Sequence, residues 1–205
     1  MCKETDSGNS VYGRNATAGS LYDFANYPTA PAFTIYDTGG TDTLDASGYG
    51  VNQTINLNAE AFSSIGGLNN NISIARGVVI EGAVAGNGAD SMLGNAGDNL
   101  LAGNAGADTL DGGAGNDSLD GGAGGDRLIG GDGTDIIDYR LVSGTISFNL
   151  ATGIGSGSDV GTDTLLGIEG AAGGQGADNF FGDAGNNLFF GNAGADTLNA
   201  GAGSD

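Results

Sequence analysis

The chain has 205 residues, of which 25 are acidic and 5 are basic, so its formal charge at pH 7 is −20. Such a charge disfavours binding to nucleic acid and to anionic membranes, and it favours a cationic partner. The chain has no histidine, and its single cysteine, Cys2, cannot form an intramolecular disulfide. No run approaches the roughly 18 apolar residues of a membrane-spanning helix, so we expect none.

Short β-strands are expected along the first 84 residues. Residues 5–15 indicate a strand and a turn, and Pro28 and Pro31 indicate an extended linker. We divide this part into a lead-in segment with a linker (1–32) and a β-rich region (33–84). Residues 58–68 resemble a connecting turn. The predicted strands are at about 33–36, 43–44, 53–57, 72–74 and 78–80.

Residues 85–138 consist of one nine-residue unit written six times: AGNGADSML, GNAGDNLLA, GNAGADTLD, GGAGNDSLD, GGAGGDRLI and GGDGTDIID. The shared pattern is G-G-x-G-x-D-x-U-x, with a large apolar residue (U) at place eight. This pattern is known from calcium-binding parallel β-helix repeats, called RTX repeats. Glycine at places one, two and four favours a tight turn, and the last three places suit a short strand whose middle side chain points inward.

Two units then make one coil of about 18 residues, and turns one coil apart lie on the same edge. Asp90, Asp108 and Asp126 are expected along one edge, and Asn99, Asp117 and Asp135 along the other. A disordered Gly/Asp-rich linker would fit the composition. The strict phase and the apolar place eight argue against it. The sequence therefore predicts an all-β, right-handed parallel β-roll.

The period is interrupted at 139–172 and resumes at 173–205. In the connecting segment we expect a strand at 146–150 and a loose Gly/Ser loop up to Asp159. IEGAVAGNGAD (80–90) and IEGAAGGQGAD (168–178) align residue for residue, so Glu81 and Glu169 occupy the sixth place of a degenerate leading unit. GTDTL also occurs twice, at 40–44 and 161–165. The chain thus divides into a first roll block (85–138), a connecting segment (139–172) and a second, shorter block (173–205).

Carboxylates stacked in every coil repel one another unless a cation lies between them. Calcium suits such a site because it takes six to eight oxygen ligands in flexible geometry, whereas magnesium keeps its waters and zinc prefers His and Cys. We expect several calcium ions. The predicted side-chain ligands are Asp90, Asn99, Asp108, Asp117, Asp126, Asp135, Glu169, Asp178, Asn187, Asp196 and Asp205. The predicted carbonyl ligands are Gly86, Gly88, Gly103, Gly106, Gly112, Gly113, Gly115, Gly121, Gly122, Gly124, Gly130, Gly131, Gly133, Gly174 and Gly176.

Residues 5–138 resemble the C-terminal region of the serralysins, a family of secreted bacterial zinc metalloproteases. The resemblance is carried by SVYGRN (10–15), TIYDTGGTDTLDASGY (34–49), QTINLNAEAFSSIGGL (53–68), NISIARGVVIEGA (71–83) and the repeats. It implies further calcium ligands ahead of the repeats. By position these are Asp6, Gly8, Ser10, Asp37, Gly39, Gly40, Asp42, Val79 and Glu81.

A serralysin also needs a His-Glu-x-x-His motif to hold zinc, and this chain has no histidine. We therefore expect this chain not to be an enzyme by itself, and we expect a catalytic domain to precede it in a parent protein. The start MCKETDSGNS lacks the apolar region of a secretory signal peptide, and the end at Asp205 lacks the family's C-terminal secretion signal. A fragment or truncated product is the simplest interpretation.

The sequence thus predicts a structural calcium-binding roll from a secreted, extracellular serralysin-like protease that is exported by type I secretion. Scarce intracellular calcium would leave the chain unfolded, and extracellular calcium would drive folding. Acid should release calcium and unfold the roll. One alternative is an extracellular RTX adhesin or matrix protein, and another is the calcium-binding module of a polysaccharide-modifying enzyme such as an alginate epimerase. The serralysin-like stretch before the repeats argues against the epimerase.

Overall fold

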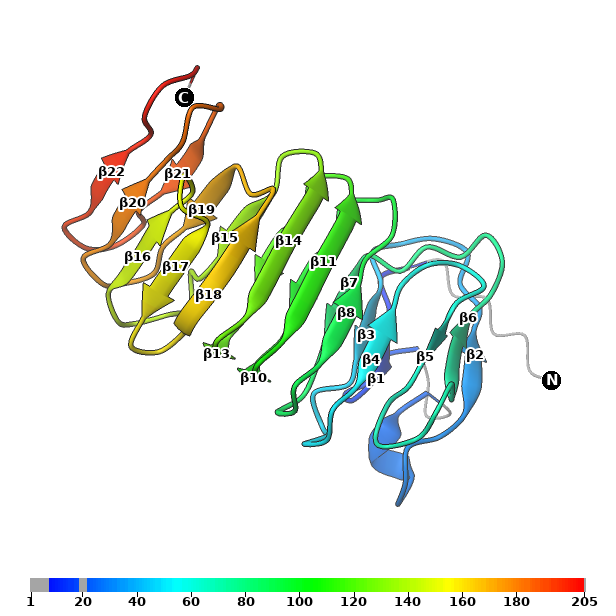
Figure 1. Cartoon of the computed structure of the whole chain (residues 1–205). Coiled ribbons are helices and arrows are strands. Elements are labelled where there is room, and N and C mark those ends of the chain that lie inside the picture. The colour runs from blue at the N-terminus through cyan, green and yellow to red at the C-terminus, as the bar shows by residue number, and fades with distance from the viewer. Residues whose placement is uncertain (1–7, 19–21, 205) are drawn as a thin grey trace.

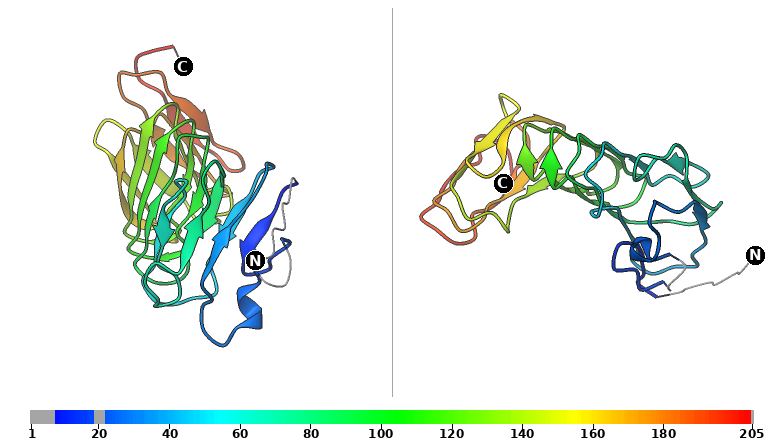
Figure 2. Two further views of the ribbon diagram at one scale, coloured as in Figure 1. Left: turned by 90° about the vertical axis from the view of Figure 1, so that its right-hand side faces the viewer. Right: turned by 90° about the horizontal axis from the view of Figure 1, so that it is seen from below.

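Two facing sheets of short, mainly parallel strands form most of the molecule (Figure 1). The structure is a computed structural model, and it describes residues 8–18 and 22–204. The chain winds back and forth between the two sheets, and its coils follow one another along the long axis (Figure 2). This is the parallel β-roll that the repeats predict. In the described residues, no helix is long and apolar enough to cross a membrane.

The first sheet has eight strands, in the order β1 (Val11–Gly13), β3 (Thr43–Asp45), β7 (Gly82–Val84), β9 (Leu100–Ala102), β12 (Ser118–Asp120), β15 (Ile136–Asp138), β19 (Gly170–Ala172) and β21 (Leu188–Phe190). The second has eleven strands. Along its main path the order is β22 (Thr197–Asn199), β20 (Asn179–Phe181), β16 (Ile146–Asn149), β17 (Ile154–Gly157), β18 (Gly161–Leu166), β14 (Arg127–Asp132), β11 (Thr109–Ala114), β8 (Ser91–Leu93) and β4 (Thr54–Asn56).

Three smaller parts complete the fold. The short strands β10 (Ala105–Gly106) and β13 (Ala123–Gly124) pair within the turns of the second sheet. A separate sheet near the N-terminal end contains β2 (Phe33–Ile35), β6 (Ile72–Ile74) and β5 (Phe62–Ser63). One 3-10 turn, η1, spans Phe24–Asn26.

The register of the strands confirms the coil of two nonapeptides. In the second sheet Ser91 pairs with Thr109 and Thr109 with Arg127, and in the first sheet Leu100 pairs with Ser118 and Ser118 with Ile136. Each step is 18 residues. The connecting segment does not interrupt the sheets, because Arg127 pairs with Thr164 and Ile136 with Gly170.

The core lies between the two sheets and is built from place eight of the repeats. The side chains at this place in the first block are at most 1% exposed: Met92, Leu101, Leu110, Leu119, Leu128 and Ile137. In the second half aromatic rings replace the aliphatic column. Tyr139 packs on Phe148, Phe148 on Phe180 and Phe180 on Phe189, with ring centroids 5.3–5.6 Å apart.

The strand predicted at 78–80 is absent, and the strand in this part of the chain is β7 (Gly82–Val84), four residues further on. The reason is the nonapeptide phase. Glu81 holds place six of the leading unit, so places seven to nine fall on Gly82–Val84. Val78 and Ile80 are buried in the loop before β7, and their apolar character reflects this burial and not strand formation.

Two short strands form where turns or loops were expected. β5 lies in the predicted connecting turn and pairs antiparallel with β6. β17 lies in the predicted Gly/Ser loop and pairs antiparallel with both β16 and β18. A Cβ atom on Gly155 would lie 2.6 Å from the ring of Phe148, so this strand needs a glycine for close packing. Glycine reduces strand propensity, which is why the sequence indicated a loop.

The roll should tolerate truncation of outward apolar side chains but not of inward ones. Leu119 is fully buried, whereas Leu100 in the neighbouring strand is 56% exposed. We expect Leu119→Ala to lower the free energy of unfolding by about 2–5 kcal/mol because it leaves a cavity. Leu100→Ala is the control and should cost about 0.5 kcal/mol or less. Urea unfolding in saturating calcium measures both, and equal costs would contradict the inward assignment of place eight.

Candidate metal sites along the roll

A row of hydrogen-bonded carboxylates follows one edge of the roll. The Oδ1 atom of Asp108 accepts from the backbone N–H of Asp90 at 2.7 Å, and that of Asp126 accepts from the N–H of Asp108 at 2.8 Å. The row extends at both ends, from Gln53 N–H to Asp90 (2.6 Å) and from Asp126 N–H to Asp163 (2.9 Å). Each carboxylate therefore connects its own coil to the coil before it.

A second row follows the opposite edge. The N–H of Asn99 donates to Asp117, that of Asp117 to Asp135 and that of Asp135 to Glu169, over 2.7–2.9 Å. The Asn99 side-chain amide donates to the carbonyl oxygen of Glu81 at 3.3 Å. Both glutamates of the internal echo thus lie in this row.

The second block repeats the same geometry with fewer coils. Asp178 accepts from the N–H of Ile146, and Asp196 accepts from the N–H of Asp178, both at 2.9 Å. The side-chain amide of Asn187 donates to the carbonyl oxygen of Glu169 at 3.4 Å. The second block is thereby attached to the row of the first.

Among the described repeat units, four carboxylates have a buried Oδ2 atom without any hydrogen-bond partner: Asp108, Asp117, Asp126 and Asp135. In Asp90 and Asp178, by contrast, Oδ2 accepts from the place-two N–H of the same unit, at 3.1 Å and 3.0 Å. Place two of the four units has a left-handed backbone, with φ between 69° and 116°, at Asn104, Gly113, Gly122 and Gly131. An unsatisfied buried polar group costs about 1–3 kcal/mol, and a charged group costs more.

The glycines of the repeats leave room for these carboxylates. A Cβ atom on Gly112, at place one, would lie 2.1 Å from Oδ2 of Asp117, and one on Gly124, at place four, would lie 1.5 Å from the Gly106 carbonyl oxygen. The predicted carbonyl glycines lie along both edges of the roll, in the turns and in the adjoining strands β10, β11, β13 and β14. On the edge of Asp90 these are Gly86, Gly88, Gly103, Gly106, Gly121, Gly122 and Gly124. On the opposite edge they are Gly112, Gly113, Gly115, Gly130, Gly131 and Gly133, and in the second block Gly174 and Gly176.

Burial raises the pKa values of these carboxyls. Loss of hydration is the largest cause, and it raises the pKa of Asp126 to about 7 and those of Asp108 and Asp117 to about 6. Burial also raises the pKa of Asp135. Backbone N–H donors oppose these shifts without cancelling them. Near neutral pH, the ionised carboxylates therefore destabilise the ion-free roll.

Part of the lead-in shares this geometry. The N–H of Ser10 donates to Oδ1 of Asp42, and the N–H of Asp42 donates to Oε2 of Glu81, both at 2.8 Å. The Ser10 hydroxyl donates to the Gly8 carbonyl, and a Cβ on Gly40 would lie 2.4 Å from that carbonyl oxygen. Five of the positions implied by the family resemblance are thus brought together.

The remaining lead-in positions differ. Asp37 accepts from the N–H of Gly39 at 2.9 Å and from the hydroxyl of Tyr12, so both of its oxygens are hydrogen-bonded. Val79 is 51% exposed, in the turn before β7. Two further predicted positions lie outside the described residues: Asp6 and Asp205.

Asp163 and Tyr139 belong to the site region but were not among the predicted site residues. Asp163 is fully buried and continues the first row after Asp126, and its Oδ2 accepts from the Tyr139 hydroxyl at 2.8 Å. The second GTDTL copy was the available signal, because it places Asp163 at the position of Asp42. Tyr139 had no sequence signal of its own.

Residues 8–18 and 22–204 contain no group of three or more His, Cys, Asp or Glu side chains that could hold a metal ion. A bound ion would therefore need backbone carbonyls as well as carboxylates. The donor set of the turns consists of oxygens alone, and it includes four buried carboxylate oxygens without partners. This set fits a hard cation such as calcium and does not fit zinc.

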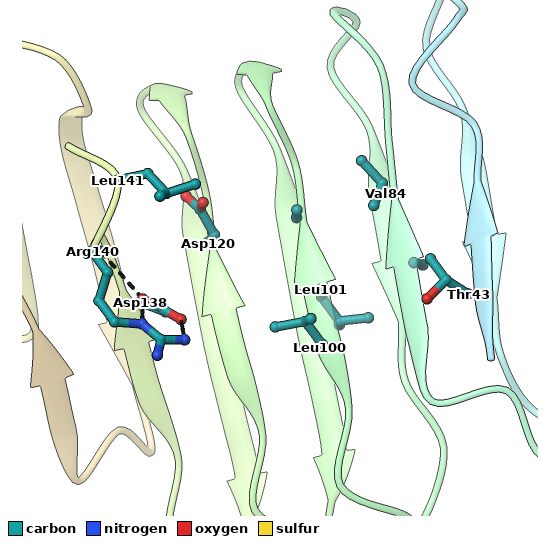
Figure 3. A pocket seen from close by; sticks show the side chains of 10 residues that line it. Thr43, Val84, Leu100, Leu101, Asp120, Asp138, Arg140 and Leu141 are labelled. Atoms are coloured by element: carbon teal, nitrogen blue, oxygen red, sulfur yellow. Dashed lines mark hydrogen bonds and ion pairs between the residues drawn. The ribbon is translucent and has the colours of Figure 1, made fainter. Parts of the chain in front are cut away.

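A groove on the outer face of the eight-stranded sheet has a different character (Figure 3). Leu100, Val84 and the 93% exposed Leu141 contribute apolar surface. Asp138 and Arg140 form an ion pair at one end of it. The unpartnered carboxylate oxygens lie at the edges of the roll and not in this groove.

Comparisons with known proteins agree with this architecture. Residues 2–203 match the family described as Peptidase M10 serralysin C terminal. Serralysin B of Dickeya chrysanthemi is 50% identical over 90 residues, which are 43% of this chain and 19% of that protein. Metalloprotease AprA of Pseudomonas entomophila is 46% identical over 93 residues, which are 45% of this chain and 19% of that protein. The chain thus spans about a fifth of the length of these curated relatives, and it belongs to the Peptidase M10 serralysin C-terminal family.

Proposed function

We propose that the roll binds several calcium ions and folds when it does so. The observation that carries this proposal is the set of four buried Oδ2 atoms without a hydrogen-bond partner. A cation at these atoms would offset both the desolvation of the carboxylates and their mutual repulsion. With 25 acidic and 5 basic residues, the chain has few cations of its own to do this.

The ions would be held between successive turns on each edge. Asp108, Asp117, Asp126 and Asp135 would supply charge, and the carbonyls of the glycine turns would supply the other oxygens. In the lead-in, Asp42, Glu81 and the Gly8 carbonyl would form a comparable site. The free energy of ion binding would offset the cost of burying the charged carboxylate rows.

The relatives indicate the setting in which this roll works. They are named serralysins and metalloproteases, and the chain covers only a fifth of their length. We infer that the roll is the structural part of a secreted serralysin-like metalloprotease and that zinc catalysis belongs to another domain. Calcium outside the cell would then drive folding after type I secretion. The family match supports this setting over an RTX adhesin.

Calcium should convert the chain from coil to β-structure. In chelator at pH 7.5 we expect a coil-like circular dichroism spectrum, because the ionised rows are unfavourable to bury. Titration with calcium should restore the β signal, and the same concentration of magnesium should restore much less of it. A full β spectrum in chelator would contradict the proposal.

Removing one charge from a row should weaken calcium binding. Asp117 is 1% exposed and has an unpartnered Oδ2, whereas Asp98 is exposed and accepts from the Asn116 N–H. We expect Asp117→Asn to raise the calcium midpoint at least about tenfold, as the loss of groups around metal sites commonly does. Asp98→Asn keeps its acceptor oxygen and is the control. Isothermal titration measures both, and equal affinities for the two variants would refute the role of Asp117.

The raised pKa values predict opposite pH responses with and without calcium. In the ion-free fold the pKa of Asp126 is about 7 and that of Asp108 about 6, above the roughly 3.9 of an unfolded chain. Their contribution to stability is therefore complete below about pH 4 and is lost as the pH rises through 6 to 7. Calcium needs the ionised form, so its affinity should fall as the pH falls through the same window.

Acid should thus release calcium while making the ion-free fold less unfavourable, so the raised pKa values replace the expectation from the sequence that acid unfolds the roll. Calcium titrations at pH 5.5 and 7.5 measure the pH dependence of the affinity, and the circular dichroism β signal of the chain in chelator at the same two pH values measures that of the ion-free fold. Slopes of the same sign would contradict the assignment of the shifted carboxyls to the ion sites.

A further inference from the structure

Asp163 continues the first row of carboxylates beyond the first block. β18 pairs with β14, so Asp163 lies one coil after Asp126, although the two are 37 residues apart. Its Oδ1 accepts from the Asp126 N–H, as in every earlier coil of the row. Its Oδ2 differs from those of Asp108 and Asp126, because it accepts from the Tyr139 hydroxyl at 2.8 Å.

Tyr139 is held firmly in position for this hydrogen bond. Its side chain is fully buried, and its ring packs on Phe148 with centroids 5.6 Å apart. Its backbone N–H donates to the Ala172 carbonyl at 2.9 Å. Burial and the charge of Asp163 raise the pKa of Tyr139, so the hydroxyl keeps its proton and remains a donor.

Neutral donors also occupy the second row where the blocks begin. At Asn99 and Asn187 place six carries an amide in place of a carboxylate. The side-chain nitrogens donate to the carbonyl oxygens of Glu81 and Glu169, at 3.3 Å and 3.4 Å. At these two positions a side-chain N–H group of the protein connects neighbouring coils.

We propose that the Tyr139 hydroxyl takes the place of a cation at Asp163. The hydrogen bond between Tyr139 and Asp163, here called the joint, then connects the two roll blocks without calcium. This inference rests on the proposed calcium binding of the neighbouring coils. The joint links the aliphatic core of the first block to the aromatic core of the second. The two blocks can then take up their ions without a metal site between Asp126 and Asp163.

The number of bound ions tests the joint directly. In Asp163→Asn the phenol oxygen can accept from the new amide, so the fold should persist. We expect this variant to bind as many calcium ions as the wild-type chain in equilibrium dialysis, whereas Asp126→Asn should bind at least one fewer. Loss of an ion in Asp163→Asn would overturn the inference. A wild-type chain that binds no calcium would instead refute the proposed function.

Removing the hydroxyl tests the hydrogen bond itself. Tyr139→Phe keeps the ring and leaves Oδ2 of Asp163 without a donor, so in saturating calcium we expect the urea midpoint to fall by about 1 M. Tyr36→Phe is the control, because Tyr36 is 42% exposed, and it should leave the midpoint unchanged. A Tyr139→Phe midpoint equal to that of the wild-type chain would contradict the joint.

Discussion

The hydrogen bond from a backbone N–H in one coil to a carboxylate oxygen in the next determines much of this structure. It recurs through both edges, for example from Asp90 to Asp108 and from Asp117 to Asp135. It uses an acidic residue at place six of most units, and it buries that residue against the turn. One oxygen of each carboxylate thus joins the coils, and in four units of the first block the other oxygen has no protein donor.

The proposed ion binding would therefore be coupled to folding. The buried carboxyls have raised pKa values because hydration is lost, and the chain has five basic residues against 25 acidic ones. The two salt bridges among the described residues, Arg76–Glu60 and Arg140–Asp138, do not involve the rows. The proposed cation from solution would supply this compensating charge.

The nonapeptide phase made a large part of the fold predictable. It gave the 18-residue register, the inward place eight and the division of Asp90 and Asp117 between two edges. It also places β7 at Gly82–Val84 once Glu81 is assigned to place six. The apolar run at 78–80, considered alone, wrongly predicted a strand at those residues. A periodic signal was more informative than local propensity because the turn geometry is repeated and the strands are only three residues long.

The parts without a period could not be predicted as well. β17 has the composition of a loop because it packs tightly on Phe148, and the partner of Asp163 comes from a tyrosine 24 residues earlier. Only tertiary structure brings these groups together. The unpartnered oxygens were also beyond sequence reasoning, because they depend on the left-handed backbone at place two.

A crystal structure grown in calcium tests the central claim most directly. The account predicts ions at the edges of the first block, each within about 2.3–2.6 Å of Oδ2 of Asp108, Asp117, Asp126 or Asp135 and of turn carbonyls. Ordered waters or backbone N–H groups at these four oxygens, with no ion present, would contradict it.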